Sequence, residues 1–236
     1  MRLDKYLAEA GLGSRKEVKV ILKTGKVTVN DQKVKDGKRH VEPGKDSVNY
    51  DGQPLVYQEF YYYLLNKPAG VVSATKDNKD KTVVELLKAQ DFREDLFPVG
   101  RLDKDTEGLL LLTNDGPLSH NLLSPKKHVE KEYFAQIQGQ VTQETVREFA
   151  AGLTLKSGEN VKPGQLFIEK SGESKSDIRL IIHEGKFHQV KRMFEAVWMK
   201  VTYLKRIRMG SLKLDKALTL GAYRPLTEEE ILKLKE

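Results

Sequence analysis

The sequence predicts an α+β protein with a small basic N-terminal part and a larger C-terminal part. Segments typical of strands outnumber those typical of helices along the 236 residues. Residues 1–58 are rich in lysine and turn signals, whereas residues 59–236 contain no internal repeat or low-complexity stretch. We therefore expect two domains, 1–58 and 59–236, the second with a mixed or antiparallel sheet and helices packed against it.

Two short helices are expected at the start of the chain. Leu3, Leu7 and Ala10 recur at helical spacing, and glycines then end that helix. Ser14, followed three residues later by Glu17, forms a capping box that starts the second helix. The apolar face of this helix is formed by Val18, Ile21 and Leu22. Its basic face is formed by Arg15, Lys16, Lys19 and Lys23, with Lys26 just after.

Strands dominate the remainder of the chain. In the first block, the alternating segments 27–29 and 47–50 are separated by turn signals. In the second block, residues 61–65 predict a strand that ends at 66–68. The leucine run at 109–112, stopped by Asn-Asp-Gly, predicts a fully buried strand and a turn. Further strands are expected at residues 131–138, 166–168 and 178–182.

Capping boxes predict helices in the second block as well. Thr82 with Glu85 predicts a helix through Leu87, and Thr227 with Glu230 predicts one near the C-terminus. The box pattern supplies two reciprocal hydrogen bonds to amides that a helix start leaves unsatisfied.

Charge and residue types narrow the classes of function. The formal net charge of +7 makes a polyanion the first partner to consider, because clustered Lys and Arg release counterions from phosphates on binding. Cysteine is absent, which excludes disulfides, thiolate nucleophiles and Cys-ligated zinc. Residues 1–5 carry charge where a signal peptide is apolar, and no apolar run is long enough to span a bilayer. We expect a cytoplasmic protein without membrane attachment.

The residue spacing excludes the common metal-binding and nucleotide-binding motifs. The acids of residues 103–107 imitate the start of a calcium loop, but the twelfth position is Asn114 instead of glutamate. His183 and His188 are five residues apart with a glycine between them, so they do not share a helix face for zinc. No glycine-rich phosphate loop is present. No metal site is expected, and the chemistry falls to carboxylate, Tyr, Lys or Arg side chains.

Residues 98–116 carry the strongest chemical signal. A polar loop containing Asp103 runs directly into the buried leucine strand, an arrangement that fixes a reactive side chain on a rigid support. Polarity alone also fits an Asp103 that only accepts hydrogen bonds from amides of the turn. The surrounding identities favour the first interpretation, because residues 100–103, with Thr106 and Gly108, resemble the catalytic aspartate motif of the RluA/RsuA group of pseudouridine synthases.

Three further segments resemble motifs of that group, in the same order. They are residues 65–68 followed by Gly70, residues 131–133 and residues 184–194. Residues 2–7, 10–15 and 25–30 resemble the S4 RNA-binding domain. A run of lysines is most often a solvated helix face, but acidic partners at i+4 are nearly absent from the second helix. The resemblance implies an S4 domain in 1–58, which grips folded RNA, and a pseudouridine synthase catalytic domain in 59–236.

The resemblance also implies roles for three catalytic residues. Asp103 is the implied nucleophile or charge-bearing group, and attack at C1′, attack at C6 and removal of a sugar proton stay open. Tyr133 corresponds to the tyrosine that stacks on the target uracil, with a core aromatic as the alternative. Lys191 corresponds to the cation that pairs with the carboxylate; a phosphate-binding Lys191, with Arg192 as the partner instead, is the alternative. The isomerisation transfers no group or electron, so no cofactor is expected.

The expected partner is ribosomal RNA or a ribosomal assembly intermediate, bound by a monomer. Residues 124–131 and 188–194 look most like the branch that modifies small-subunit rRNA, at position 516 of 16S rRNA. A sister enzyme acting on 23S rRNA and a non-catalytic RNA-binding factor are the alternatives. Arg101 is expected to hold the site of the flipped nucleotide. A second basic cluster is expected from Lys186, Arg192, Lys200, Lys205, Arg206 and Arg208.

Overall fold

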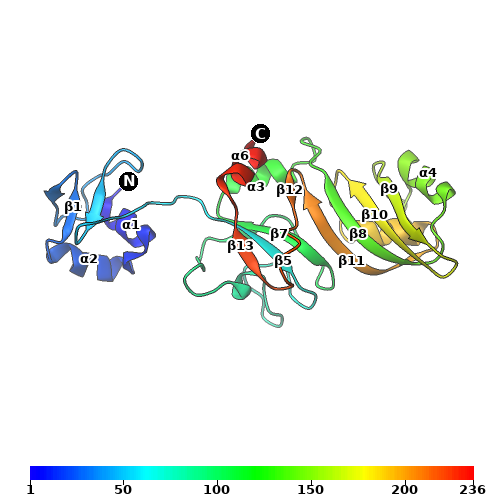
Figure 1. The fold of residues 1–236 in the computed structure, drawn as a ribbon, viewed down its shortest axis with the longest axis horizontal. Helices are drawn as coiled ribbons and strands as arrows, with labels where there is room; N and C mark the ends of the chain where they lie inside the picture. The colour runs from blue at the N-terminus through cyan, green and yellow to red at the C-terminus, as the bar shows by residue number, and fades with distance from the viewer. The chain divides into compact units, whose positions relative to one another are not determined.

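The computed structural model describes all 236 residues, which divide into two compact units, Met1–Phe60 and Tyr61–Glu236 (Figure 1). Each unit has a hydrophobic core of its own. No helix has the length and apolar character needed to cross a membrane.

The first unit packs three helical segments against a four-stranded sheet. Its helices are α1 (Leu3–Leu7), a π-helical segment (Ala8–Leu12) and α2 (Arg15–Lys23). Its strands, in the order β2-β1-β3-β4, are β1 (Val27–Val29), β2 (Gln32–Lys33), β3 (Val48–Tyr50) and β4 (Gln53–Pro54). The predicted capping box is confirmed, since Glu17 N donates to Ser14 Oγ and Ser14 N donates to Glu17 Oε2. Val18 and Leu22 are buried, Ile21 is half-buried, and the predicted basic face is exposed.

The second unit is built on a nine-stranded mixed sheet. Its main order is β13-β5-β7-β11-β8-β10-β9, with β12 on β11 and β6 on β7. The strands are β5 (Tyr62–Lys67), β6 (Phe97–Pro98), β7 (Glu107–Thr113), β8 (Lys131–Gln138), β9 (Gln165–Ser171), β10 (Lys175–Ile182), β11 (Lys200–Met209), β12 (Leu212–Lys213) and β13 (Tyr223–Pro225). Only β7 and β11 pair in parallel. The leucine run is confirmed as the centre of β7, with β5 and β11 on either side.

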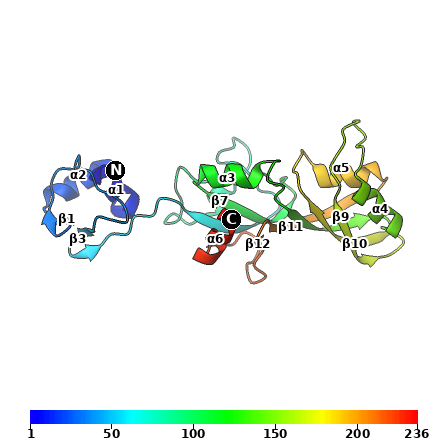
Figure 2. The same ribbon diagram turned by 90° about the horizontal axis from the view of Figure 1, so that it is seen from above.

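The second unit has four helices, two of which pack at one end of the sheet. The helices are α3 (Gly116–Leu123), α4 (Gln143–Ala151), α5 (Gln189–Ala196) and α6 (Glu228–Lys235). α4 packs on β9 and α5 on β11, and both lie at the β8–β10 end of the sheet (Figures 1 and 2). Phe149 of α4 and Phe194 of α5 meet there, with ring centroids 4.8 Å apart, in the core that also receives Ile137 of β8.

In the second unit one strand prediction is confirmed and two other predictions need correction. The predicted first strand is confirmed as β5, which ends at Lys67, within the expected end at residues 66–68. The box at Thr82 forms only in part: Glu85 Oε2 accepts from Thr82 N and Oγ1, and only a 3₁₀ turn, Val84–Leu86, follows before Leu87 becomes extended. The turn after β7 begins an unpredicted helix, α3, because Asp115 accepts a capping bond from Leu118 N.

Candidate active site

Asp103 lies in the loop between β6 and β7, which leads into the buried strand β7. The loop closes on itself through a hydrogen bond from Thr106 N to the carbonyl oxygen of Asp103. The Asp103 side chain is 26% exposed, so the carboxylate is accessible but partly shielded. The support below it is rigid, because every residue from Gly108 to Thr113 is buried.

Lys67 holds the Asp103 loop from inside the protein. Its side chain is fully buried at the end of β5. Its Nζ donates to the carbonyl oxygens of Thr106 at 2.8 Å, Asp103 at 3.1 Å and Lys104 at 3.3 Å, and to its neighbour Pro68 at 3.0 Å. Burial lowers the pKa of Lys67 to about 8, with the charges of nearby acids, Asp105 first, opposing it. The second residue of the Asn-Lys-Pro segment is therefore a positioning residue for the loop.

Lys191 reaches Asp103 from the first turn of α5. Its Nζ lies 3.1 Å from Asp103 Oδ2 and 2.6 Å from Asp105 Oδ1. Val190, Met193 and Phe194 occupy the buried face of α5, as the helical spacing predicts, which directs Lys191 away from the core. Arg192, the alternative partner for Asp103, instead binds Glu159 Oε2 at 2.8 Å.

The Lys191 environment favours its charged form. Burial lowers the pKa of Lys191, but hydrogen bonds to Asp105 and Asp103, together with their negative charges, outweigh burial and leave the pKa above its ordinary value. The pKa of Asp105 is lowered: burial raises it, but the hydrogen bond and charge of Lys191 outweigh burial. The ammonium is therefore protonated throughout the neutral range.

His188 contacts the other oxygen of the same carboxylate. Its Nε2 lies 3.5 Å from Asp103 Oδ1, whereas Lys191 approaches Oδ2. The residue adopts a left-handed conformation, with φ of 48°, directly before α5, and its ring stacks on Phe187 with centroids 3.7 Å apart. Sequence reasoning assigned no role to His188, although its place three residues before Lys191 is the signal that would have found it.

Tyr133 lines the same small pocket as Asp103. It projects from β8, where residues 131, 133, 135 and 137 alternate as the buried face of the strand. Arg101 and Asp103 from the loop, Tyr133 from β8, and Lys186 and His188 from the segment before α5 all contribute to the pocket wall. Three of the sequence motifs thus meet at one pocket, and the fourth supports it from below through Lys67.

A close backbone approach joins β7 and β11 beside this pocket. A Cβ atom at Gly108 would lie 2.2 Å from the carbonyl oxygen of Arg206, and Gly108 has a φ of +103°. Arg206 is 1% exposed, and its Nε donates to the carbonyl oxygen of Leu109 at 2.8 Å. The glycine that follows the acidic loop is therefore required by the sheet geometry.

Comparison with known proteins identifies the family. The protein-family model described as RNA pseudouridylate synthase matches residues 61–196, and the S4 domain model matches residues 1–46. The chain belongs to the RNA pseudouridylate synthase family. The protein is thus an isomerase that acts on RNA, built from an S4 domain and a pseudouridine synthase domain.

Several relatives match this synthase over nearly their whole length. An uncharacterized RNA pseudouridine synthase, YtzG, of Bacillus subtilis is 50% identical and covers 100% of the chain and 99% of the relative. Ribosomal small subunit pseudouridine synthase A of Escherichia coli is 41% identical, with 98% of each chain covered. A crystal structure of a pseudouridylate synthase matches with a TM-score of 0.69 and 36% identity, covering 99% of each chain.

Two members of the expected second basic cluster of this synthase are not available to RNA. Arg206 is buried in the sheet, and Arg208 is held by Glu130 and Glu132 at 2.7 and 2.8 Å. The β11 cations do not form one cluster because neighbouring residues of a strand face opposite sides of the sheet and the β11 register shifts between Arg206 and Arg208. Lys186 and Arg192 do lie together, joined by their shared partner Glu159. Arg101 is exposed at the pocket mouth.

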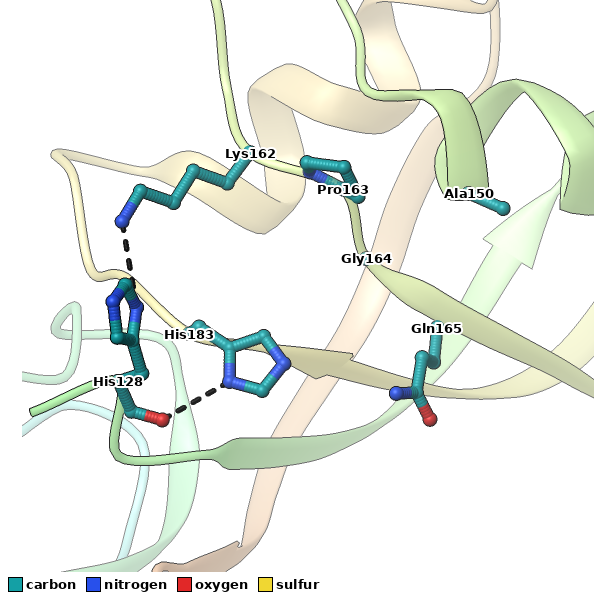
Figure 3. A pocket seen from close by; sticks show the side chains of 7 residues that line it. All are labelled: His128, Ala150, Lys162, Pro163, Gly164, Gln165 and His183. Carbon is teal, nitrogen blue, oxygen red and sulfur yellow. Dashed lines mark hydrogen bonds between the residues drawn. The ribbon is translucent and has the colours of Figure 1, made fainter.

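A wider cleft of about 350 Å³ adjoins the segment that leads to α5 of the synthase. His183 Nδ1 donates to the carbonyl oxygen of His128 at 3.0 Å, and Lys162 Nζ lies 3.5 Å from His128 Nδ1 (Figure 3). Figure 3 shows the Lys162 and His128 side chains directed toward each other across this cleft. These contacts within the protein account for the placement of the Lys162, His128 and His183 side chains in the cleft.

Proposed function

We propose that this synthase converts a uridine of small-subunit ribosomal RNA to pseudouridine, with Asp103 as the catalytic group. The observation that carries the proposal is the contact of 3.1 Å between Lys191 Nζ and Asp103 Oδ2 in the pocket that Tyr133 also lines. A carboxylate held beside a permanent cation, next to an aromatic platform, suits a reaction that builds charge on a flipped nucleotide.

Each residue has a distinct task in the proposed reaction. The N1–C1′ bond of uridine breaks, the uracil rotates, a C5–C1′ bond forms, and C5 loses its proton while N1 gains one. Asp103 supplies the negative charge at the reacting sugar or base, and Lys191 keeps that charge paired in a partly buried site. Tyr133 provides a face on which the uracil stacks as it turns. No atom is gained or lost overall, so no cofactor is required.

The choice of RNA rests on the relatives. Enzymes named ribosomal small subunit pseudouridine synthase A from Yersinia pestis, Vibrio vulnificus and Escherichia coli are each 41% identical to this chain and cover 98% of it. Within 16S rRNA we propose position 516 as the target. We propose that the enzyme works in the cytoplasm as a monomer, on rRNA or an assembly intermediate.

RNA binding is assigned mainly to the first unit, for which we propose the bounds 1–58. The basic residues on the exposed face of α2 have no acidic side chain within ion-pair distance, so they are available to phosphates. They are Arg15, Lys16, Lys19 and Lys23. Lys26 is exposed as well but pairs with Asp51 at 2.7 Å. Because four or more phosphate contacts release counterions, affinity should fall steeply with salt, and a shallow slope would contradict this assignment.

Mapping of pseudouridine in a deletion strain tests the proposed function. Carbodiimide treatment and primer extension on 16S and 23S rRNA should show one stop missing from 16S rRNA in the deletion strain. The wild-type gene should restore that stop, and Asp103→Asn should not. A lost stop in 23S rRNA would assign the enzyme to the large subunit instead. Restoration by Asp103→Asn would remove Asp103 from the catalytic role.

A further inference from the structure

A second cavity, of about 770 Å³, opens on the face of the sheet opposite Asp103. Glu132 and Phe134 line it from β8, where they alternate with Tyr133, so they face away from the catalytic pocket. Tyr203 and Lys205 of β11 and the segment 213–218 complete most of its wall. Its volume lies within the range of small-ligand sites, about 300–1,000 Å³. Nothing in the proposed reaction uses this face.

This open-face cavity carries an excess of positive charge, which comes from its lysines. Its two arginines are neutralised, because both share Glu132 and each also pairs with a second glutamate. Glu132 accepts from Arg179 Nη1 at 2.9 Å and from Arg208 Nε at 2.8 Å, Glu169 pairs with Arg179, and Glu130 pairs with Arg208. Its three lysines have no acidic side chain within ion-pair distance. They are Lys205, Lys213 and Lys216. Unpaired ammonium groups at the edge of a cavity favour a ligand that carries phosphate.

Asn66 adds an unsatisfied acceptor to the cavity wall. The residue is only 3% exposed, and its Nδ2 donates to the carbonyl oxygen of Leu218 at 2.7 Å. That bond fixes the amide orientation, and Asn66 Oδ1 has no hydrogen-bond partner. Buried acceptors are almost always paired, so the free oxygen indicates a ligand that brings an N–H group.

The remaining wall is apolar and aromatic. Phe134 and Tyr203 meet edge to face with centroids 6.2 Å apart, and Tyr203 is fixed by its hydroxyl, which donates to Glu107 Oε2 at 2.6 Å. Ile207, Leu214 and Leu218 supply aliphatic surface. Fixed aromatic rings beside unpaired cations are the combination that binds nucleobases of single strands.

We propose that this open-face cavity binds an unpaired nucleotide of RNA. The base lies against Phe134 and Tyr203, an N–H of the base donates to Asn66 Oδ1, and Lys205, Lys213 and Lys216 contact phosphates. RNA is favoured over a free nucleotide because three separate unpaired lysines suit several linked phosphates. The proposal rests on the proposed function in that it makes the bound strand part of the substrate RNA.

Methyl NMR spectra of the full chain test this site with a probe that the enzyme cannot modify. A short oligocytidylate contains no uridine, and its amino groups supply the N–H donors. We expect it to shift the methyl signals of Ile207, Leu214 and Leu218. The double variant Lys213→Glu/Lys216→Glu should weaken this binding about tenfold or more. The matched double variant Lys170→Glu/Lys175→Glu, at exposed positions outside the cavity, should leave it nearly unchanged.

Three outcomes would overturn the site. They are unshifted methyl groups, equal effects of the two double variants, and equal binding of an abasic strand, which has no base to donate to Asn66. Shifts with cytidine monophosphate but not with the oligonucleotide would overturn the assignment to RNA. The Asp103→Asn protein should bind the oligocytidylate normally while failing to form pseudouridine. Loss of the proposed function and loss of this site are therefore measured separately.

Discussion

Lys191 Nζ lies 3.1 Å from Asp103 Oδ2, and the same ammonium lies 2.6 Å from Asp105 Oδ1. The two carboxylates differ in exposure, 26% for Asp103 and 72% for Asp105. The more exposed acid is well solvated without a partner, whereas the more shielded one depends on the cation. The Lys191–Asp103 contact is therefore the one on which catalysis should depend.

Replacing Lys191 by Met should lower kcat by about 100-fold or more, because the charge on Asp103 loses its counter-ion in the pocket. The dissociation constant for RNA should stay within about twofold, since Lys191 is bound to carboxylates and is not available to phosphates. Single-turnover tritium release and filter binding measure the two quantities. Asp105→Asn is the matched control, with kcat expected within about fivefold of wild type. A Lys191→Met enzyme with normal kcat but weak binding would instead make Lys191 a phosphate contact.

Replacing Lys67 by Met should lower the free energy of unfolding by about 2–4 kcal/mol, because several carbonyl oxygens of the Asp103 loop lose a buried donor. The folded variant should also have a reduced kcat, since the loop is no longer held. Urea denaturation and single-turnover rates measure these effects. Lys126→Met, at an exposed position, should change the free energy of unfolding by no more than about 0.5 kcal/mol and leave kcat close to that of wild type. A Lys67→Met protein as stable as wild type would show that the loop does not need this clamp.

Much of the site could be predicted from the sequence, because motifs separated along the chain meet in the fold. Residues 100–103, Tyr133 and the start of α5 were expected to act together, and the structure brings them to one pocket. The helical spacing of Val190, Met193 and Phe194 correctly predicted that Lys191 faces away from the core. Local patterns were sufficient there because helix phase fixes side-chain direction.

The features that the sequence did not predict depend on tertiary contacts. The role of Lys67 depends on carbonyl groups 36 to 39 residues away, which no local pattern reveals. Arg206 resembles an exposed cation in sequence, but the pairing of β7 with β11 buries it. The box at Thr82 failed as a helix signal because Leu87 becomes extended after one turn. Propensity and capping are weak wherever packing decides the outcome.

Replacing Gly108 by Ala should destabilise the protein by about 3 kcal/mol or more. A Cβ there would overlap the carbonyl oxygen of Arg206, and the backbone φ of +103° is strained for any other residue. Thermal or urea denaturation measures the change. Gly116→Ala is the control: it lies at the start of α3, has no heavy atom within 4 Å of the added Cβ, and should be neutral or slightly stabilising. Equal stability of the two variants would contradict the close approach of β7 and β11.

Replacing Glu230 by Gln should reduce stability in a way that depends on pH. Glu230 accepts two hydrogen bonds of 2.8 Å from Arg224, with a third from Thr227 N. The Arg224 bonds come first among the causes that lower the pKa of Glu230 from 4.5 to about 2. The folded state thus holds the carboxylate charged at pH values where the unfolded chain is protonated. Its contribution is complete above about pH 5 and is lost as the pH falls toward 2.

At pH 7 we expect Glu230→Gln to cost about 1–2 kcal/mol, less than the full pKa difference would give, because the pair is partly exposed to solvent. Urea denaturation of wild type and variant between pH 7 and pH 2.5 measures the difference, which should shrink steadily as the pH falls. Glu228→Gln, an exposed position in the first turn of the same helix, should show a small difference with little pH dependence. If the Glu230→Gln difference were the same at pH 7 and pH 2.5, the Arg224 pair would not be what anchors α6 to β13.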